Sequence, residues 1–165
     1  MRRVVLALVA GAVLLVLGVA QATATGTTYG FNLTGPNFAE NSGNGDVIRV
    51  TGSGTFNPSM VTATGSGSFT HRHSDGALVA KGTWVATGFT GFTSYGGPSN
   101  GFQGGSVRIV VRLFPSGGGS VPGVAMTVTC HVGTVPGGAP EEGTMVDGLG
   151  FTESIGGFTL MHIVS

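Results

Sequence analysis

The segment Gly52-Ser53-Gly54-Thr55-Phe56 returns thirteen residues later as Gly65-Ser66-Gly67-Ser68-Phe69, and Gly82-Thr83-Trp84 repeats it in shortened form. Each full copy has glycine at its first and third positions and ends on an aromatic residue. Glycine inside a strand marks a bulge, a sharp bend or a close approach of two backbones, and these features let a sheet coil into a barrel. A solenoid or a propeller needs at least three repeats to bury its faces. The repeat therefore predicts bending positions in a small closed sheet.

The chain after Thr25 consists of short runs of β-branched and aromatic residues, separated by clusters of Gly, Asn, Ser, Asp and Pro. This pattern is typical of many strands joined by turns, and no segment carries apolar residues at helical spacing over three turns. We expect an all-β domain of about eight antiparallel strands, arranged as a small barrel or a sandwich. The expected strands cover residues 29–33, 46–56, 60–73, 77–89, 104–114, 123–132, 143–149 and 158–164.

Two of these expected strands alternate apolar and polar side chains, which is typical of half-buried antiparallel strands. The apolar positions are Val107, Ile109, Val111 and Leu113 in the first strand, and Val124, Met126, Val128 and Cys130 in the second. Between the third and fourth expected strands, Asp75-Gly76 supplies the positive φ that a tight hairpin turn needs. We therefore expect a hairpin that turns at this dipeptide.

Length and composition indicate one folded domain. The 165 residues fit a single domain, and although 32 of them are glycine, 41% are hydrophobic and the formal net charge is 0. Disordered chains combine few apolar residues with a high net charge. Seven basic residues balance seven acidic ones, so no basic patch is expected for nucleic acid. The single cysteine, Cys130, cannot form an internal disulfide.

The N-terminus has the pattern of an export signal. Arg2 and Arg3 precede the uncharged run 4–20, and Ala20-Gln21-Ala22 offers the small-x-small pattern that signal peptidase accepts. We expect a hydrophobic leader helix, a signal peptide over residues 1–22 that is cleaved after Ala22, and a single all-β domain over 25–165. The protein would then be secreted or extracytoplasmic. The run is also long enough for the alternative, an uncleaved membrane anchor, which would be the chain's only contact with a membrane.

His71 and His73 are the candidate metal ligands. Residues two apart on a strand project from the same face, and two imidazoles on one face can share a metal ion. A third ligand would have to come from His131, His162 or Asp75. The alternative is solvated polar surface at the end of a hairpin, and no cofactor is expected.

A second candidate site would form if charged side chains met inside a barrel. Such a polar lumen could bind or isomerise a small ligand, and Arg49, Arg108 and Arg112 are its candidate ligand-binding residues. The alternative is that these charges face outward and keep the sheet soluble. The full set is Asp46, Arg49, Arg108, Arg112, Asp147 and Glu153.

Two adjacent pairs carry groups that are capable of chemistry. Cys130 and His131 are neighbours on a strand and therefore face opposite ways, which separates a thiol nucleophile from its base. We expect Cys130 to be a buried small hydrophobe. Glu141 and Glu142 lie in a Pro/Gly-rich loop, where solvation is expected to keep them out of acid/base work. No catalytic residue is assigned.

Several motifs together resemble a group of secreted bacterial-type proteins of unknown function. They are the run 46–56, Phe69-Thr70-His71-Arg72, Gly82-Thr83-Trp84, Ser94-Tyr95-Gly96 and Gly157-Phe158-Thr159-Leu160. More distantly, the Gly-x-Gly-x-Phe motif is similar to the strand motif of dirigent and allene-oxide-cyclase-like eight-stranded barrels. That resemblance implies a barrel that binds apolar small molecules in its lumen, and it transfers no catalytic residue.

The sequence favours an exported, non-enzymatic β-domain with a binding or surface-interaction role. Two alternatives stay open: a small-ligand-binding or isomerase/cyclase-like barrel, and a structural or adhesive cell-surface protein. The expected partner is a small apolar ligand or a cell-surface component.

Overall fold

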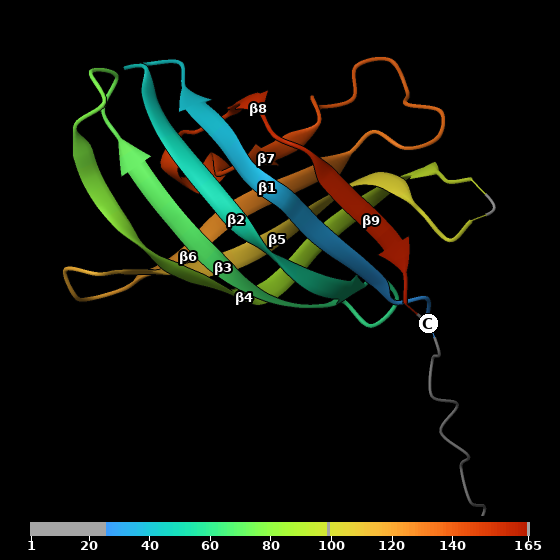
Figure 1. Cartoon of the computed structure of the whole chain (residues 1–165). Coiled ribbons are helices and arrows are strands. Elements are labelled where there is room, and N and C mark those ends of the chain that lie inside the picture. The colour runs from blue at the N-terminus through green and yellow to red at the C-terminus, as the bar shows by residue number, and fades with distance from the viewer. Residues whose placement is uncertain (1–25, 99, 165) are drawn as a thin grey trace, which may run out of the picture.

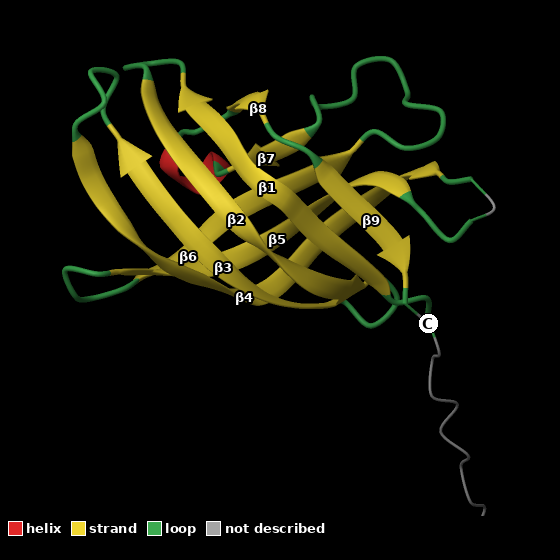
Figure 2. Ribbon diagram, in the orientation of Figure 1, coloured by secondary structure: helices red, strands yellow, loops and turns green. Residues whose placement is uncertain are grey.

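The computed structural model describes residues 26–98 and 100–164, and the expected leader lies outside them. Almost all of the regular secondary structure is β-strand (Figure 2). None of the helices in these two ranges has the length and apolar character needed to span a bilayer. The strands are β1 (Tyr29–Asn41), β2 (Asp46–Asn57), β3 (Thr62–Arg72), β4 (Leu78–Gly96), β5 (Gly104–Pro115), β6 (Val121–Cys130), β7 (Gly143–Met145), β8 (Glu153–Gly156) and β9 (Thr159–Ile163), with the 3-10 turn η1 (Asp147–Leu149) after β7.

The strands form one antiparallel sheet in the order β7-β6-β5-β4-β3-β2-β1-β8, and β9 also pairs with β1 (Figure 1). β8 pairs with β1 over Phe38–Glu40, and β9 pairs with it over Tyr29–Leu33. Because these two short strands share one edge of β1, the sheet has eight positions and curls into a nearly closed barrel. The all-β prediction is confirmed, and the structure is a barrel rather than a sandwich.

Strand boundaries differ from expectation where glycine and proline lie inside strands. β1 continues to Asn41 because Gly35 and Pro36 form a bulge, seen as a register shift between Leu33 and Asn37. β4 continues to Gly96 through three such shifts. The expected strand 143–149 is instead the short β7 followed by η1, and β8 was not expected at all.

The glycine repeat pairs with itself across β2 and β3. Gly52 lies opposite Gly67, and Gly54 lies opposite Gly65. A Cβ at Gly67 would overlap the carbonyl oxygen of Thr51, and a Cβ at Gly54 would overlap that of Thr64. The indole of Trp84 and the ring of Phe31 occupy the space beside these glycines, and Trp84 Nε1 donates to the Thr51 carbonyl at 3.0 Å. The close backbone approach expected for the repeat is therefore present.

Apolar side chains pack together as one core inside the barrel. The inward residues of β5 and β6 are the eight predicted from alternation, and all eight are buried. They form one cluster with Trp84 of the neighbouring β4 and with Phe31, Ile48 and Phe69 of β1, β2 and β3. At one end, the rings of Tyr29, Phe56, Phe89 and Phe92 stack on one another.

The predicted hairpin is confirmed. The Gly76 amide donates to the His73 carbonyl at 2.8 Å, Gly76 has a φ of 87°, and Asp75 Oδ1 accepts the Ala77 amide at 2.8 Å. This turn joins β3 to β4 and fixes their register.

Side chains rather than a strand ladder close the barrel between β7 and the β8/β9 edge, along a line that we call the closure seam. Ser154 Oγ donates to the Glu142 carbonyl at 2.8 Å, Thr159 Oγ1 donates to the Thr129 carbonyl, and Thr144 Oγ1 donates to Asn37 Oδ1 at 3.4 Å. Glu142, which was expected to be solvated, accepts the Thr159 amide at 3.3 Å. The buried polar groups of the seam therefore partner one another.

We expect Gly67→Ala to lower the free energy of unfolding by roughly 2–3 kcal/mol, because the added methyl group forces two backbones apart. Urea denaturation followed by tryptophan fluorescence measures this, since Trp84 lies at the site. Gly91→Ala is the control, because a Cβ there meets no atom within 4 Å and the change should be within about 0.5 kcal/mol. Equal effects of the two variants would contradict the role given to the glycine pairs.

Candidate functional site

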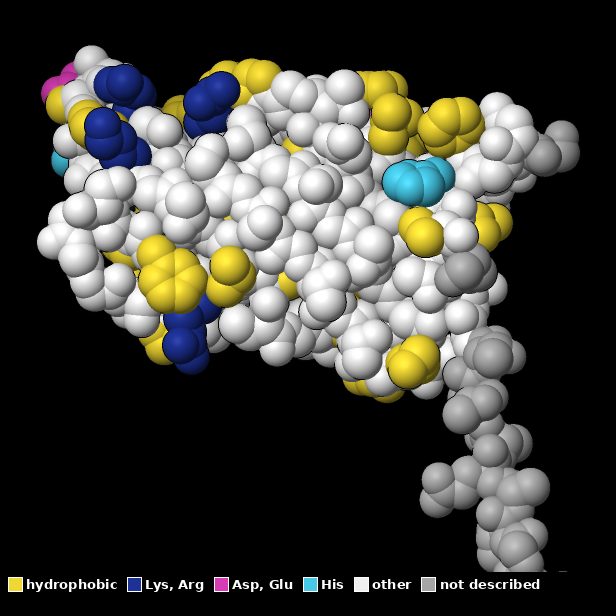
Figure 3. All heavy atoms as spheres, turned by 60° about the horizontal axis from the view of Figure 1, so that its bottom comes forward, with side chains coloured by type: hydrophobic (Ala, Val, Ile, Leu, Met, Phe, Trp, Pro, Cys, Tyr) yellow, Lys and Arg dark blue, Asp and Glu magenta, His cyan; other side chains and the backbone are white. Residues whose placement is uncertain are grey.

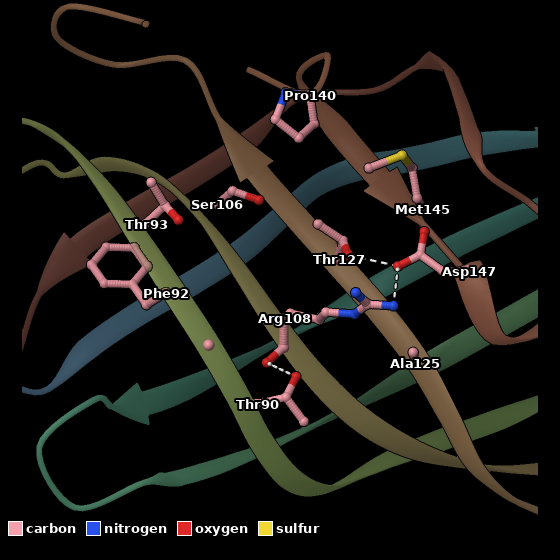
Figure 4. Close-up of a pocket in the computed structure, with 11 residues that line it drawn as sticks. Thr90, Phe92, Thr93, Ser106, Arg108, Ala125, Thr127, Pro140, Met145 and Asp147 are labelled. Atoms are coloured by element: carbon pink, nitrogen blue, oxygen red, sulfur yellow. Dashed lines mark hydrogen bonds and ion pairs between the residues drawn. The ribbon is translucent and has the colours of Figure 1, made fainter. Parts of the chain in front are cut away.

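A groove on the outer surface of the barrel crosses four neighbouring strands. Strand register places Gly91 of β4, Arg108 of β5, Thr127 of β6 and Met145 of β7 on one line across the sheet. This groove, which we call the outer groove, has a volume of about 760 Å³ (Figure 4). Its lining residues are Thr90, Gly91, Phe92, Thr93, Ser106, Arg108, Ala125, Thr127, Pro140, Met145 and Asp147.

A charged pair lies in the middle of the outer groove. The Arg108 guanidinium nitrogen lies 3.5 Å from Asp147 Oδ2, and Thr127 Oγ1 donates to the same oxygen at 2.8 Å. Figure 4 shows Asp147 facing Arg108 and Thr127. The Asp147 side chain is mostly covered, whereas that of Arg108 is 56% exposed. Because a guanidinium has five N–H donors, Arg108 keeps donors for a ligand while Asp147 fixes its position.

The rest of the outer groove combines hydroxyl groups with apolar surface. Thr90 Oγ1 donates to the Arg108 carbonyl at 3.0 Å and so holds the β4 side of the groove against β5. Gly91 has no side chain, and a Cβ there would meet open space, so this position leaves room beside Arg108. Ala125, Pro140 and Met145 supply apolar surface, whereas the Phe92 ring packs inside the barrel against Tyr29 and Phe56. Such a mixture of a few fixed polar groups with apolar walls is typical of small-molecule sites.

The candidate polar lumen does not form, and the arginines take the alternative arrangement in which they face outward. Arg49, Arg108 and Arg112 lie at exposed positions of their strands, and Glu153 is exposed on β8. The physical reason is strand alternation: the arginines occupy the positions between buried Val and Ile residues. Arg49 instead lines a smaller outer groove of about 170 Å³, together with Phe38, Val47, Thr70 and Arg72.

Asp46 is the exception among these charges, because it is buried at one end of the barrel. His71 Nε2 lies 2.9 Å from Asp46 Oδ2, and His73 Nδ1 lies 3.2 Å from both carboxylate oxygens. The hydrogen bond from His71 holds the Asp46 pKa below its ordinary value of 3.8; burial acts in the opposite direction, and His73 reinforces the lowering. The His71 ring also packs edge-on against Phe151. The two imidazoles therefore share one carboxylate.

The third metal ligand expected beside His71 and His73 lies elsewhere in each case. His131 Nε2 is 2.8 Å from the Pro140 carbonyl, the His162 ring covers Gly30, and Asp75 caps the hairpin turn. Across residues 26–98 and 100–164, no three His, Cys, Asp or Glu side chains are placed to hold a metal ion together.

Cys130 is buried, as expected, and burial raises the pKa of its thiol above the ordinary value of 9.0. A thiol with a raised pKa is a poor nucleophile at neutral pH. His131 is directed to the β6–β7 loop by its contact with Pro140. The two neighbours therefore do not form a nucleophile and base pair.

Sequence reasoning missed two features of these sites. The contact of Asp46 with the two histidines depends on the pairing of Val47 with Arg72, which sets the register of β2 and β3. Arg108 and Asp147 both belong to the set of charges considered for the lumen, but they meet on the outer face of the barrel. The only sequence signal for the outer groove was that Arg108 alternates with buried neighbours and must face outward.

We expect Asp46→Asn to lower the melting temperature at neutral pH. Since the Asp46 pKa is lower in the folded state than in the unfolded chain, the carboxylate stabilises the fold above about pH 3.9, and this contribution is lost as the pH falls through the folded-state pKa. The difference in melting temperature between the variant and the unsubstituted protein should therefore shrink as the pH falls below about 3.9. Circular dichroism melts from pH 7 to pH 2 measure this difference. Glu141→Gln, in an exposed loop, is the control and should leave the melting temperature unchanged. A difference that stays constant over this pH range would rule out the ionic origin.

Cys130 should not react with a maleimide in the folded protein at pH 7, because its thiol is buried and its pKa is raised. Labelling should become complete in denaturant. Mass spectrometry of the two samples checks this, and rapid labelling without denaturant would show that β6 opens readily.

Comparison of the chain with protein-family models, with curated proteins and with solved structures finds no significant match.

Proposed function

We propose that this chain is an extracytoplasmic, non-enzymatic binding domain that holds a polyhydroxylated ligand, such as a cell-surface oligosaccharide, in the outer groove. The observation that carries the proposal is the line of Gly91, Arg108, Thr127 and Met145 across four strands, with Asp147 beside it. A guanidinium and a carboxylate side by side provide both donors and acceptors, which is what a chain of hydroxyl groups requires. The groove volume lies within the range of ordinary ligand pockets.

The apolar walls support the same class of ligand. Sugars present C–H faces as well as hydroxyl groups, and Ala125, Pro140 and Met145 supply apolar surface beside the charged pair. The Asp147 carboxylate is already held in place by the hydroxyl of Thr127, at 2.8 Å. A site whose side chains are already held in place loses little conformational entropy on binding.

The barrel interior does not support the alternative of a lumen ligand. Val107, Ile109 and Val111 of β5 are fully buried against Val128 and Met126 of β6. A ligand in the lumen would have to displace this packed core, which is costly. The apolar lumen ligand implied by the resemblance to dirigent-like barrels is therefore not part of this proposal.

The non-enzymatic part of the proposal is supported by two pairs of groups that the fold separates. Cys130 is buried, whereas the neighbouring His131 contacts the Pro140 carbonyl. Glu142 is engaged at the closure seam, whereas Glu141 is exposed. In this arrangement the two groups of each pair cannot act together on one reacting group of a substrate.

The test is retention on an array of neutral and acidic oligosaccharides, followed by calorimetry with the best-retained one. We expect Arg108→Ala to weaken binding about tenfold or more, since it removes charge-assisted hydrogen bonds. Gly91→Phe should abolish binding by filling the groove. Two controls should bind normally: Arg112→Ala, four residues along the same strand, and Gly117→Phe, in the open β5–β6 turn. If no oligosaccharide is retained, or if the groove variants bind as well as the controls, the proposal fails.

A further inference from the structure

The N-terminal and C-terminal ends of the described chain meet at one end of the barrel, which we call the terminal end. The Val164 amide donates to the Thr28 carbonyl at 2.8 Å, and Asn57 Nδ2 donates to the Gly26 carbonyl at 2.8 Å. Asn57 also accepts the Met60 amide and so holds the β2–β3 turn at this end. The Ile163 amide donates to the Gly101 carbonyl, which adds the β4–β5 connection.

Exposed apolar side chains gather at the terminal end. Met60 and Val61 at the tip of the β2–β3 turn are 59% and 65% exposed, and Ile163 and Val164 at the end of β9 are 49% and 52% exposed. Single exposed apolar residues are common on soluble domains. Hydrogen bonds through Thr28 and Asn57 hold the segments of these four residues at the same end of the barrel. We call the four together the apolar patch, because apolar groups gathered at one place mark contact surfaces.

The surroundings of this apolar patch carry almost no charge. No Asp, Glu, Lys or Arg occurs in residues 26–39, 50–70, 82–107 or 154–164, and these ranges contain the parts of β1, β2, β3, β4 and β9 that reach the terminal end. Figure 3 shows the Lys and Arg side chains gathered at the left of the view, with none beside the point at the lower right where the described chain begins. The nearest charge along β9 is Glu142, which binds Thr159 at the other end of that strand. The patch can therefore leave water without desolvating a charge.

The backbone conformation of Val61 is a separate observation at the terminal end. This residue has a φ of 55°, and it is the one described non-glycine residue with a positive φ. This conformation is costly for a β-branched residue, and glycine or asparagine would be expected there. Strained residues persist where another requirement outweighs the strain. Here the strain accompanies an apolar side chain directed to the outside.

The uncharged run 4–20, if it stays attached, is joined to the terminal end by a short connection. Only residues 21–25 separate it from Gly26, so even a fully extended connection spans at most about 22 Å. We propose that the terminal end of the barrel rests in the headgroup region of the lipid bilayer that holds residues 4–20, with Met60, Val61, Ile163 and Val164 as its contacts. This adopts the anchored alternative for the leader and is independent of the outer groove. An uncharged, apolar contact beside a hydrophobic anchor adds a second membrane signal to the first.

The test uses the full chain reconstituted in phosphatidylcholine vesicles, with an environment-sensitive fluorophore on Met60→Cys. The buried Cys130 thiol is spared, and the unsubstituted chain measures any background label. We expect emission at shorter wavelength and quenching by doxyl groups on the lipid chains. A probe on Gly117→Cys, at the opposite end of the barrel, should show neither.

A second arm tests the patch itself with a probe on Val164→Cys. Adding Met60→Asp and Val61→Asp should return its emission to the water-exposed value. Adding Leu78→Asp and Val79→Asp, at the opposite end of β3 and β4, should leave the emission of the Val164→Cys probe unchanged. Equal emission from the Met60 and Gly117 probes would overturn the proposal. An emission shift without quenching by lipid-borne doxyl groups would mean that the leader covers the patch. A shift that depends on the protein-to-lipid ratio would mean that a second copy covers it. Either result would also overturn the proposal.

Discussion

The barrel depends on the close approach of β2 and β3 at their paired glycines. Gly52 faces Gly67 and Gly54 faces Gly65, and with no Cβ between them the backbones leave room for the rings of Trp84 and Phe31. Larger residues at these positions would hold those rings away from the strands, and the sheet would have to open to contain them. The same arrangement explains how a chain without a disulfide and with few charges forms one dense core.

Because apolar side chains fill the interior of the barrel, the candidate sites lie on its outside. Inward positions are taken by Val, Ile, Phe and Trp side chains, so polar chemistry is left to outward positions and to strand ends. Arg108 illustrates the first case, since it projects from the face of β5 opposite the buried valines and meets Asp147 there. Asp46 illustrates the second, since it lies where β2 begins and is reached by two histidines from the end of β3. Both arrangements combine residues that are distant in the sequence: the register of β2 and β3 sets the first neighbours of Asp46, and η1 carries Asp147 to Arg108.

Local pattern was sufficient to predict much of this fold. The alternation in β5 and β6, the Asp75-Gly76 turn and the bending role of the glycine repeat each depend on neighbouring residues, and each is present in the structure. Features that depend on register or closure could not be predicted. β8 is four residues long and polar at its start, so it has no pattern of its own and forms only because the edge of β1 is free to pair. The partnership of Asp46 with His71 and His73, and that of Asp147 with Arg108, likewise required knowing which strands pair and in which register.

The pairing of β1 with β9 joins the first and the last strands of the described residues. Because synthesis proceeds from the N-terminus, the edge of β1 over Tyr29–Leu33 stays unpaired until nearly the whole polypeptide has been made. Until then the β2–β6 meander can assemble through contacts between consecutive hairpins, while Phe31 and Leu33 lack their final cover from Met161 and Thr159. The Tyr29–Leu33 part of β1 therefore gains its second neighbouring strand only once β9 is available.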